Sequence, residues 1–303
     1  MPGDFPSADR SASSTQVVSG YVAPTSLEEA LALLGADPEI AVIAGGTDLV
    51  PAVRAGRREP SVIVDLRRLG LSEITVEADR IRIGAAVTFT EILGSAVLAS
   101  EYPALLDAAS EVGGPPIRNR ATLGGNLANA SPAADSAPPL LVYDASVVIA
   151  GPSGRREVPL TAFFEGPGRT VLGPGEILIE VVMPRPAGPT SAAFYKLGPR
   201  LAMAIAIVSV AVRVTYDDAG GIAACRMALG AVAPTPLRTE EAESIIYSEG
   251  LTTESIVAAS AAAARACSPI DDIRGTATYR KQMVDVLVGR LLTRLLTGGD
   301  GRD

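Results

Sequence analysis

The sequence contains no histidine, and this absence removes several kinds of chemistry from consideration. HExxH zinc sites, Ser-His and Cys-His catalysis and histidyl-linked cofactors all need an imidazole, so this chain can carry none of them. Only two cysteines occur, Cys225 and Cys267, and each has apolar or alanine-rich neighbours. Two thiols are too few to hold an iron–sulfur cluster. We expect both to be small buried side chains of a protein in a reducing cytoplasm.

Long apolar runs, basic blocks and aromatic side chains are also scarce. No apolar stretch approaches the ~20 residues that a bilayer-spanning helix needs. The chain has 26 basic and 34 acidic residues, a net charge of -8, which argues against a nucleic-acid or anionic-membrane surface. Residues 1–16 are polar and Ser-rich with an acidic flank. They predict a disordered tail rather than a signal peptide.

The remaining length is enough for about two or three compact units, and the apolar pattern suggests three. In residues 17–67, strands at 40–44 and 61–66 flank a glycine-rich turn and a helix at 48–55, which predicts a small α/β unit. Residues 68–184 begin with a hairpin at 74–83 and continue with a helix at 102–112. A strand pair at 145–159 and a last strand at 176–183 complete this second unit.

A Pro/Gly-rich linker follows and leads to a third unit at residues 190–298. Strands are expected at 192–197, 206–216 and 223–230, and helices over 239–297. The fold class expected for the whole chain is therefore α+β. It comprises two α/β subdomains and a C-terminal domain with a three-stranded antiparallel sheet and helices.

Two glycine pairs stand out, in AGGTDL (44–49) and in TLGGN (122–126). Glycine permits positive φ and has no Cβ, so successive N–H groups can point into one concavity that suits a phosphate. Thr47, Thr122 and Asn126 could add side-chain hydrogen bonds, and Asp135 could accept one from a ribose hydroxyl. Neither pair fits GxGxxG or GxxxxGK[ST]. A lone pair after a strand is more often a turn or bulge, so spacing alone leaves a structural role and a nucleotide site both open.

The residues of four motifs identify a family more specifically than the spacing of the glycine pairs does. AGGTDLVPAVRAG, IRNRATLGGNLANASPAADSAPPLL, GEILIEVVMP and RGTATYRKQMVDVLVGRLL occur in this order. Together they resemble the FAD-binding (medium) subunit of molybdenum hydroxylases, the family of xanthine dehydrogenase and carbon monoxide dehydrogenase. The resemblance implies a fold of the vanillyl-alcohol oxidase or PCMH type. Non-covalently bound FAD would lie extended between the first two units, and the third unit would help to cover the flavin.

The resemblance also implies which residues bind the cofactor. The AGGTD segment would hold the pyrophosphate, TLGGN would approach the same phosphates, and Ser131 and Asp135 would contact the sugar or phosphate region. Leu178 would pack on the cofactor, while Lys196 and Ile205 occupy flavin-adjacent positions. Arg118 and Arg120 would either neutralise phosphates or brace the loop. The full set is Val42, Ile43, Ala44, Gly45, Gly46, Thr47, Asp48, Leu49, Thr122, Leu123, Gly124, Gly125, Asn126, Ser131, Asp135, Leu178, Lys196 and Ile205.

The function implied is electron transfer inside an oxidoreductase complex, with no catalytic acid, base, nucleophile or metal ligand in this chain. Electrons would pass from [2Fe-2S] clusters of a small subunit through FAD to an external acceptor. A large subunit would carry the molybdopterin cofactor, in a heterohexamer of two copies of each chain. Two alternatives remain open: a stand-alone FAD-dependent oxidase or dehydrogenase of the same fold, and a non-catalytic FAD-binding regulatory subunit. Neither the substrate nor the acceptor is fixed by these residues.

Overall fold

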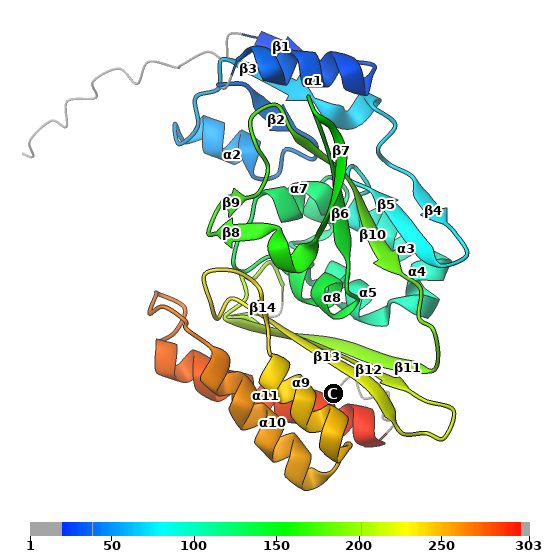
Figure 1. Cartoon of the computed structure of the whole chain (residues 1–303). Coiled ribbons are helices and arrows are strands. Elements are labelled where there is room, and N and C mark those ends of the chain that lie inside the picture. The colour runs from blue at the N-terminus through cyan, green and yellow to red at the C-terminus, as the bar shows by residue number, and fades with distance from the viewer. Residues whose placement is uncertain (1–19, 38, 201, 298–303) are drawn as a thin grey trace, which may run out of the picture.

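The computed structural model describes residues 20–37, 39–200 and 202–297, and the predicted tail at 1–16 lies outside this part of the chain. The elements form three sheet-centred units stacked along one long axis (Figure 1). The first unit (blue) lies at one end, the second (cyan to green) in the middle and the third (yellow to red) at the other end. The α+β fold class expected from the sequence is confirmed.

The first unit is a three-stranded parallel sheet in the order β1 (Gly20–Val22), β3 (Val62–Asp65), β2 (Ala41–Ile43). Helix α1 (Leu27–Ala36) connects β1 to β2, and Ser26 caps it by accepting a hydrogen bond from the N–H of Glu29. Helix α2 (Leu49–Arg54) follows β2, and a 3₁₀ turn η1 (Leu66–Arg68) follows β3. The strands predicted at 40–44 and 61–66 are present, while β1 was not predicted.

The second unit is a five-stranded antiparallel sheet with helices against it. Its strand order is β4 (Ile74–Val76), β5 (Arg80–Gly84), β10 (Ile177–Pro184), β6 (Ser146–Gly151), β7 (Gly154–Pro159), and a small hairpin β8 (Phe164–Gly166) and β9 (Arg169–Thr170) stands apart. A second 3₁₀ turn, η2 (Leu160–Ala162), leads into that hairpin. Its helices are α3 (Phe89–Gly94), α4 (Ala96–Glu101), α5 (Pro103–Glu111), α6 (Pro115–Arg118), α7 (Leu123–Ala128) and α8 (Ala137–Val142).

The third unit contains four antiparallel strands, so the predicted three-stranded sheet was one strand short. The order is β11 (Thr190–Leu197), β12 (Val208–Tyr216), β13 (Ile222–Gly230), β14 (Leu237–Arg238). Strand β14 has only two residues, too few for an alternating pattern to show in the sequence. Helices α9 (Glu240–Glu249), α10 (Thr253–Ala266) and α11 (Ala277–Thr297) cover one face of the sheet.

Three apolar cores join these layers. One of them packs α1 and β3 against the outer face of β6 and β10, so the first two units share buried side chains. The largest packs α3, α5, α7 and α8 against the second sheet and also takes in Phe194, Ala211 and Ala228 of the third sheet. The last lies between the third sheet and α9 to α11. Of the helices between residues 20 and 297, positions 38 and 201 aside, none has the length and hydropathy to cross a bilayer.

Candidate functional site

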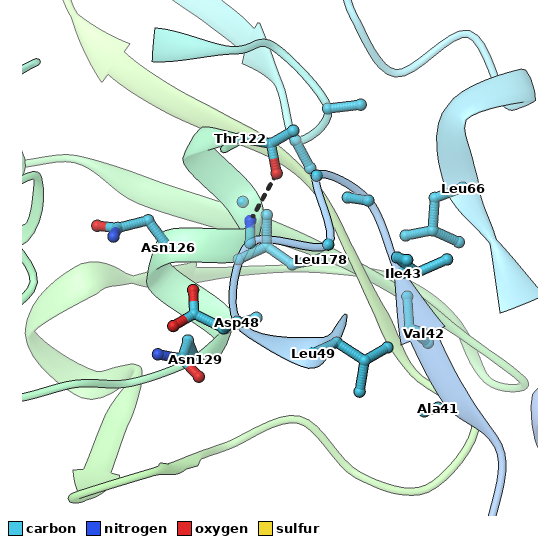
Figure 2. Close-up of a pocket in the computed structure, with 18 of the residues that line it drawn as sticks. Ala41, Val42, Ile43, Asp48, Leu49, Leu66, Thr122, Asn126, Asn129 and Leu178 are labelled. Carbon is cyan, nitrogen blue, oxygen red and sulfur yellow. Dashed lines mark hydrogen bonds between the residues drawn. The ribbon is translucent and has the colours of Figure 1, made fainter. Parts of the chain in front are cut away.

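A cavity of about 370 Å³ lies where the first two units meet. Three segments form most of its wall: the AGGTDL segment after β2, the start of α7, and residues 176–178 at the start of β10 (Figure 2). Because β2 and α7 belong to different units, the contact between those units creates the cavity. Its size lies in the range of small-molecule and cofactor sites.

The AGGTDL segment offers a row of free hydrogen-bond donors. Strand β2 ends at Ile43, and the first helical hydrogen bonds are donated by Val50 to the Gly46 carbonyl and by Ala52 to the Asp48 carbonyl, both at 3.1 Å. Between them, the backbone N–H groups of residues 45–49 donate no hydrogen bond to any part of the chain that the structure describes. Gly46 has φ of 75°, which turns successive N–H groups toward one side.

The TLGGN segment is built differently, because its glycines lie in the first turn of α7 and not in a loop. The Thr122 hydroxyl caps this helix by accepting from the Gly125 N–H at 3.1 Å. The N–H groups of Leu123 and Gly124 donate to the carbonyls of Val87 and Ala85, each at 2.9 Å. The second glycine pair therefore forms a wall of the cavity, while the free backbone donors belong to the first pair.

Two of the glycines allow the chain to approach itself closely. A Cβ on Gly45 would lie 2.0 Å from the Arg120 carbonyl oxygen, and a Cβ on Gly124 would lie 2.5 Å from the Cβ of Ala85. Both distances are far inside van der Waals contact, so no other residue fits. Gly45 thus lets the AGGTDL segment of the first unit lie against the residues that precede α7, whereas Gly124 permits close packing within the second unit.

The wall has a polar side and an apolar side (Figure 2). Asp48, Asn126 and Asn129 lie near one another, and the Asn126 amide oxygen accepts a hydrogen bond from the Ser136 hydroxyl at 2.6 Å. Val42, Ile43, Leu49, Leu66 and Leu178 provide apolar surface across the cavity. Sequence reasoning missed a further group of lining residues that lie outside both glycine motifs, chiefly Ile40, Ala41, Ala52, Arg58, Leu66, Leu71, Ala85, Ala86, Ala121, Ala128, Asn129, Leu172, Glu176 and Ile177.

Thirteen of the predicted binding residues line this cavity: 42–49, Thr122, Gly124, Gly125, Asn126 and Leu178. The other five do not. Leu123 is fully buried in the core of the second unit, Ser131 is half-buried in the loop after α7, and Ile205 is 52 % exposed in the segment before β12. Asp135 and Lys196 lie outside the cavity wall and bind each other.

The pair formed by Asp135 and Lys196 is buried between the second and third units. The Lys196 ammonium donates to Asp135 Oδ2 at 2.6 Å and to the Glu111 carbonyl at 2.9 Å, and its side chain is only 2 % exposed. Burial raises the pKa of Asp135 to about 6, although the Lys196 charge acts in the opposite direction. Asp135 Oδ1 has no hydrogen-bond partner in the described structure. Ser136, the residue after Asp135, donates its hydroxyl hydrogen bond to Asn126, which lines the cavity. The pair of Asp135 and Lys196 therefore lies next to the polar side of the cavity.

The two arginines before TLGGN have separate positions. The Arg118 guanidinium donates to the carbonyls of Ser110 (2.9 Å) and Val112 (3.2 Å) and so braces the loop after α5. Arg120 meets Gly45 through its backbone carbonyl, and its side chain is exposed. Neither side chain lines the cavity.

The arrangement suits binding of an elongated phosphate-containing ligand rather than acid–base chemistry. Free N–H groups in a concave turn favour a phosphate, small side chains leave room for the backbone to approach it, and the apolar wall can hold a flat ring. Among the residues that the structure places, no cluster of three or more acidic or cysteine side chains could hold a metal ion. The fold and the cavity thus define a chain of three units with a cavity between the first two whose free N–H groups suit a phosphate.

Comparison with known proteins agrees with this class. Residues 13–186 match the family described as "FAD binding domain in molybdopterin dehydrogenase", and residues 193–295 match "CO dehydrogenase flavoprotein C-terminal domain". The nicotinate dehydrogenase FAD-subunit of Eubacterium barkeri is 36 % identical over 287 residues, which cover 93 % of this chain and 97 % of that protein. The xanthine dehydrogenase FAD-binding subunit of Escherichia coli O157:H7 is 33 % identical, with coverage of 93 % and 97 %.

A solved structure shows the same likeness in three dimensions. Carbon monoxide dehydrogenase from Hydrogenophaga pseudoflava contains a chain that superposes with a TM-score of 0.87 at 34 % identity, covering 90 % of this chain and 96 % of that one. The chain therefore belongs to the family of FAD-binding subunits of molybdenum hydroxylases. This finding confirms the resemblance drawn from the four sequence motifs.

Proposed function

We propose that the cavity between the first two units binds FAD, with the pyrophosphate against the free N–H groups of residues 45–49. The row of five unbonded donors is the observation that carries this proposal. The chain is acidic overall, so oriented backbone dipoles rather than net charge must attract the phosphates. When bound, FAD can take up electrons one at a time, as iron–sulfur clusters deliver them, and release two to an acceptor, while the protein supplies its position and surroundings.

Each part of the wall has a role in this proposal. Gly46 exposes the backbone to the phosphates, and Leu178 with Val42 and Ile43 offers apolar surface to a ring. Asn126 and Asn129 provide amide groups on the side that leads to Asp135 and Lys196. We infer that Ser131, Asp135, Lys196 and Ile205 approach the riboflavin half, which extends from the cavity along α7. A hydrogen bond from that half to Asp135 Oδ1 would satisfy an oxygen that has no partner in the described structure.

We further propose that the chain works only within a complex, as the resemblance implies. Its partners would be a molybdopterin-binding large subunit and a [2Fe-2S] small subunit in a heterohexamer. Ile270 and Ile273 support a protein partner because they are 72 % and 99 % exposed in the segment between α10 and α11, which projects from the third unit (Figure 1). The proposed domains are residues 17–67, 68–184 and 190–298. Both cysteines are buried and free, which supports a location in a reducing cytoplasm.

The first experiment tests cofactor and electron flow together. The chain is purified with its partner chains, the flavin spectrum is recorded, and substrates of molybdenum hydroxylases are added without air. Substrate-dependent bleaching of bound flavin is the expected result. Bound FAD that no substrate reduces through the partner chains would contradict the electron-transfer role.

The second experiment tests the binding site through two glycines with the same backbone conformation. Gly46→Val and Gly56→Val each place a branched side chain at positive φ (75° and 65°), but only Gly46 lines the cavity. Nothing lies within 4 Å of a Cβ on Gly56. We expect loss of most FAD from the Gly46 variant and retention in the Gly56 variant, measured as flavin per folded chain. Equal FAD content in both would contradict the proposed position of the pyrophosphate.

A further inference from the structure

Arg58 has the only basic side chain on the wall of the cavity, as far as the structure describes the chain. The other ionisable lining residues are Asp48 and Glu176. Glu176 is already engaged, because it accepts hydrogen bonds from Arg156 (2.8 Å) and from the Gly173 N–H (2.7 Å). Within the described chain Arg58 makes no hydrogen bond or ion pair, so its guanidinium is available to a ligand.

Arg58 lies at the opposite end of β2 from the free N–H groups. Its neighbour Arg57 donates from its backbone N–H to the Ala52 carbonyl at 2.9 Å, and Ser61 donates to the Glu39 carbonyl at 3.1 Å. The first bond holds Arg57 against α2, and the second brings the segment before β3 to the beginning of β2, whereas Gly45 follows the end of that strand. Strand β2 spans three residues, so the two ends lie roughly 10 Å apart. A ligand that binds its phosphates at residues 45–49 and extends toward the beginning of β2 would therefore reach Arg58.

The two directions away from the phosphates differ in chemistry. One direction follows α7 past Asn126 toward the ion pair between Asp135 of the second unit and Lys196 of the third. The other ends among Ile40, Ala41 and Ala52, whose apolar side chains line the cavity together with Arg58. A guanidinium stacks well on an aromatic face, and more effectively than an ammonium.

On the basis of the proposed function, we propose that Arg58 binds the adenosine half of FAD by stacking its guanidinium on the adenine ring. The contact adds affinity at the end of the cavity that the backbone donors do not reach. It also gives the chain a preference for the dinucleotide over FMN, which lacks adenosine.

The test uses the full chain in its complex after removal of flavin, with FAD, ADP and FMN as separate probes. Arg58→Ala should weaken binding of FAD and of ADP by about two- to five-fold and leave FMN binding unchanged. Arg58→Lys should recover only part of the loss. Arg57→Ala is the matched control, because Arg57 is an exposed neighbour that does not line the cavity. It should bind all three probes as the unaltered chain does.

Two results would overturn the assignment. Unchanged FAD and ADP binding in Arg58→Ala would show that the guanidinium contacts no ligand. An equal loss for FMN would show that it contacts the phosphates instead of adenosine. In both cases the unaltered chain still binds FAD and the proposed function stands, whereas failure of the unaltered chain to bind FAD would overturn both.

Discussion

At the scale of single residues, the glycines of the two motifs have different structural roles. Gly45 faces the Arg120 carbonyl, and Gly124 faces Ala85, so both permit contact within the protein. Gly46 lines the cavity at positive φ and leaves the backbone donors accessible. In this glycine pair one residue serves packing and the other lines the cavity.

The close packing at Gly45 predicts the effect of a substitution on stability. Gly45→Ala places a methyl group 2.0 Å from the Arg120 oxygen and should destabilise the fold by about 1–3 kcal/mol, as overpacking does. Urea unfolding measures the change. Gly35→Ala in α1 is the control, because nothing lies within 4 Å of its Cβ, and it should stabilise by about 0.5–1 kcal/mol. Equal stability of the Gly45 variant and the unaltered chain would contradict the close approach.

The buried pair of Asp135 and Lys196 gives a second prediction. Asp135→Asn leaves the Lys196 ammonium buried without a counter-charge and should cost about 3 kcal/mol of stability. Combining it with Lys196→Met removes the stranded charge and should recover part of that loss. Thermal and urea unfolding of the single and double variants measure the coupling. A double variant that loses the sum of the two single losses would show that the residues do not act as a pair.

At the scale of elements, the long strands and helices were predictable, whereas the short strands β1 and β14 were not. Strands β5, β10, β12 and β13 carry period-two or continuous apolar patterns, and α11 has a clear helical stripe. Strand β14 has two residues, and β1 three, so their sequences contain no period. The short helix at TLGGN was not among the elements expected from the sequence, since glycines are poor helix formers. Contacts with Val87 and Ala85 override that preference.

The same limit applies to the site. The AGGTDL segment, Thr122, Asn126 and Leu178 were predicted, because they lie in motifs typical of the family. Arg58, Leu71 and Ala85 line the cavity only through the way strands and turns meet in space, so no local pattern marks them. Asp135 and Lys196 were expected at the cofactor, but their mutual ion pair depends on the contact between two units and was not predicted.

The turn after α8 shows how one element fixes another. Asp144 binds Arg213 of β12 at 2.8 Å, and Arg226 of β13 and Arg238 of β14 at 3.2 Å, which attaches the third sheet to the second unit. Asp144→Asn keeps a residue that tolerates its φ of 51° but leaves three arginines close together. We expect a loss of about 1 kcal/mol that grows at low salt.

Thermal unfolding at two salt concentrations measures that loss. Glu241→Gln is the control, because Glu241 pairs with Arg265 on the open surface and should contribute little. Identical behaviour of the two variants would show that the Asp144 cluster is no more than a surface charge group.

At the scale of the whole molecule, stability should fall in acid. Burial raises the pKa of Asp65, but hydrogen bonds from Arg67 and Tyr21 outweigh it and bring the pKa to about 2. The Arg274 N–H, with Arg280 and Arg274 side chains, lowers the pKa of Asp272 to about 2 against burial. Both values lie below the ordinary 3.8, so the stability that these groups add is present above that pH. It is lost as the pH falls toward about 2, because the unfolded chain binds more protons.

Urea unfolding between pH 7 and pH 2 measures this dependence. Asp65→Asn should lower stability at pH 7 and flatten the slope between about pH 4 and pH 2. An unchanged slope in this variant would show that Asp65 does not titrate with folding. The effect of Asp135 on the pH dependence of stability has the opposite sign, because its pKa is raised to about 6 in the folded chain. The stability that Asp135 contributes is therefore present below about pH 4 and is lost as the pH rises from about 4 to 6.

The row of unbonded N–H groups at residues 45–49 has one more consequence. Amide protons without hydrogen bonds exchange with solvent deuterium quickly, whereas those of β6 and β10, inside the second sheet, exchange only when the structure opens. A peptide covering this segment should therefore label within seconds in the free chain and slowly once a phosphate accepts its hydrogen bonds. The deuterium uptake of this segment, measured by mass spectrometry, therefore reports whether the cavity is occupied without any added dye or altered residue.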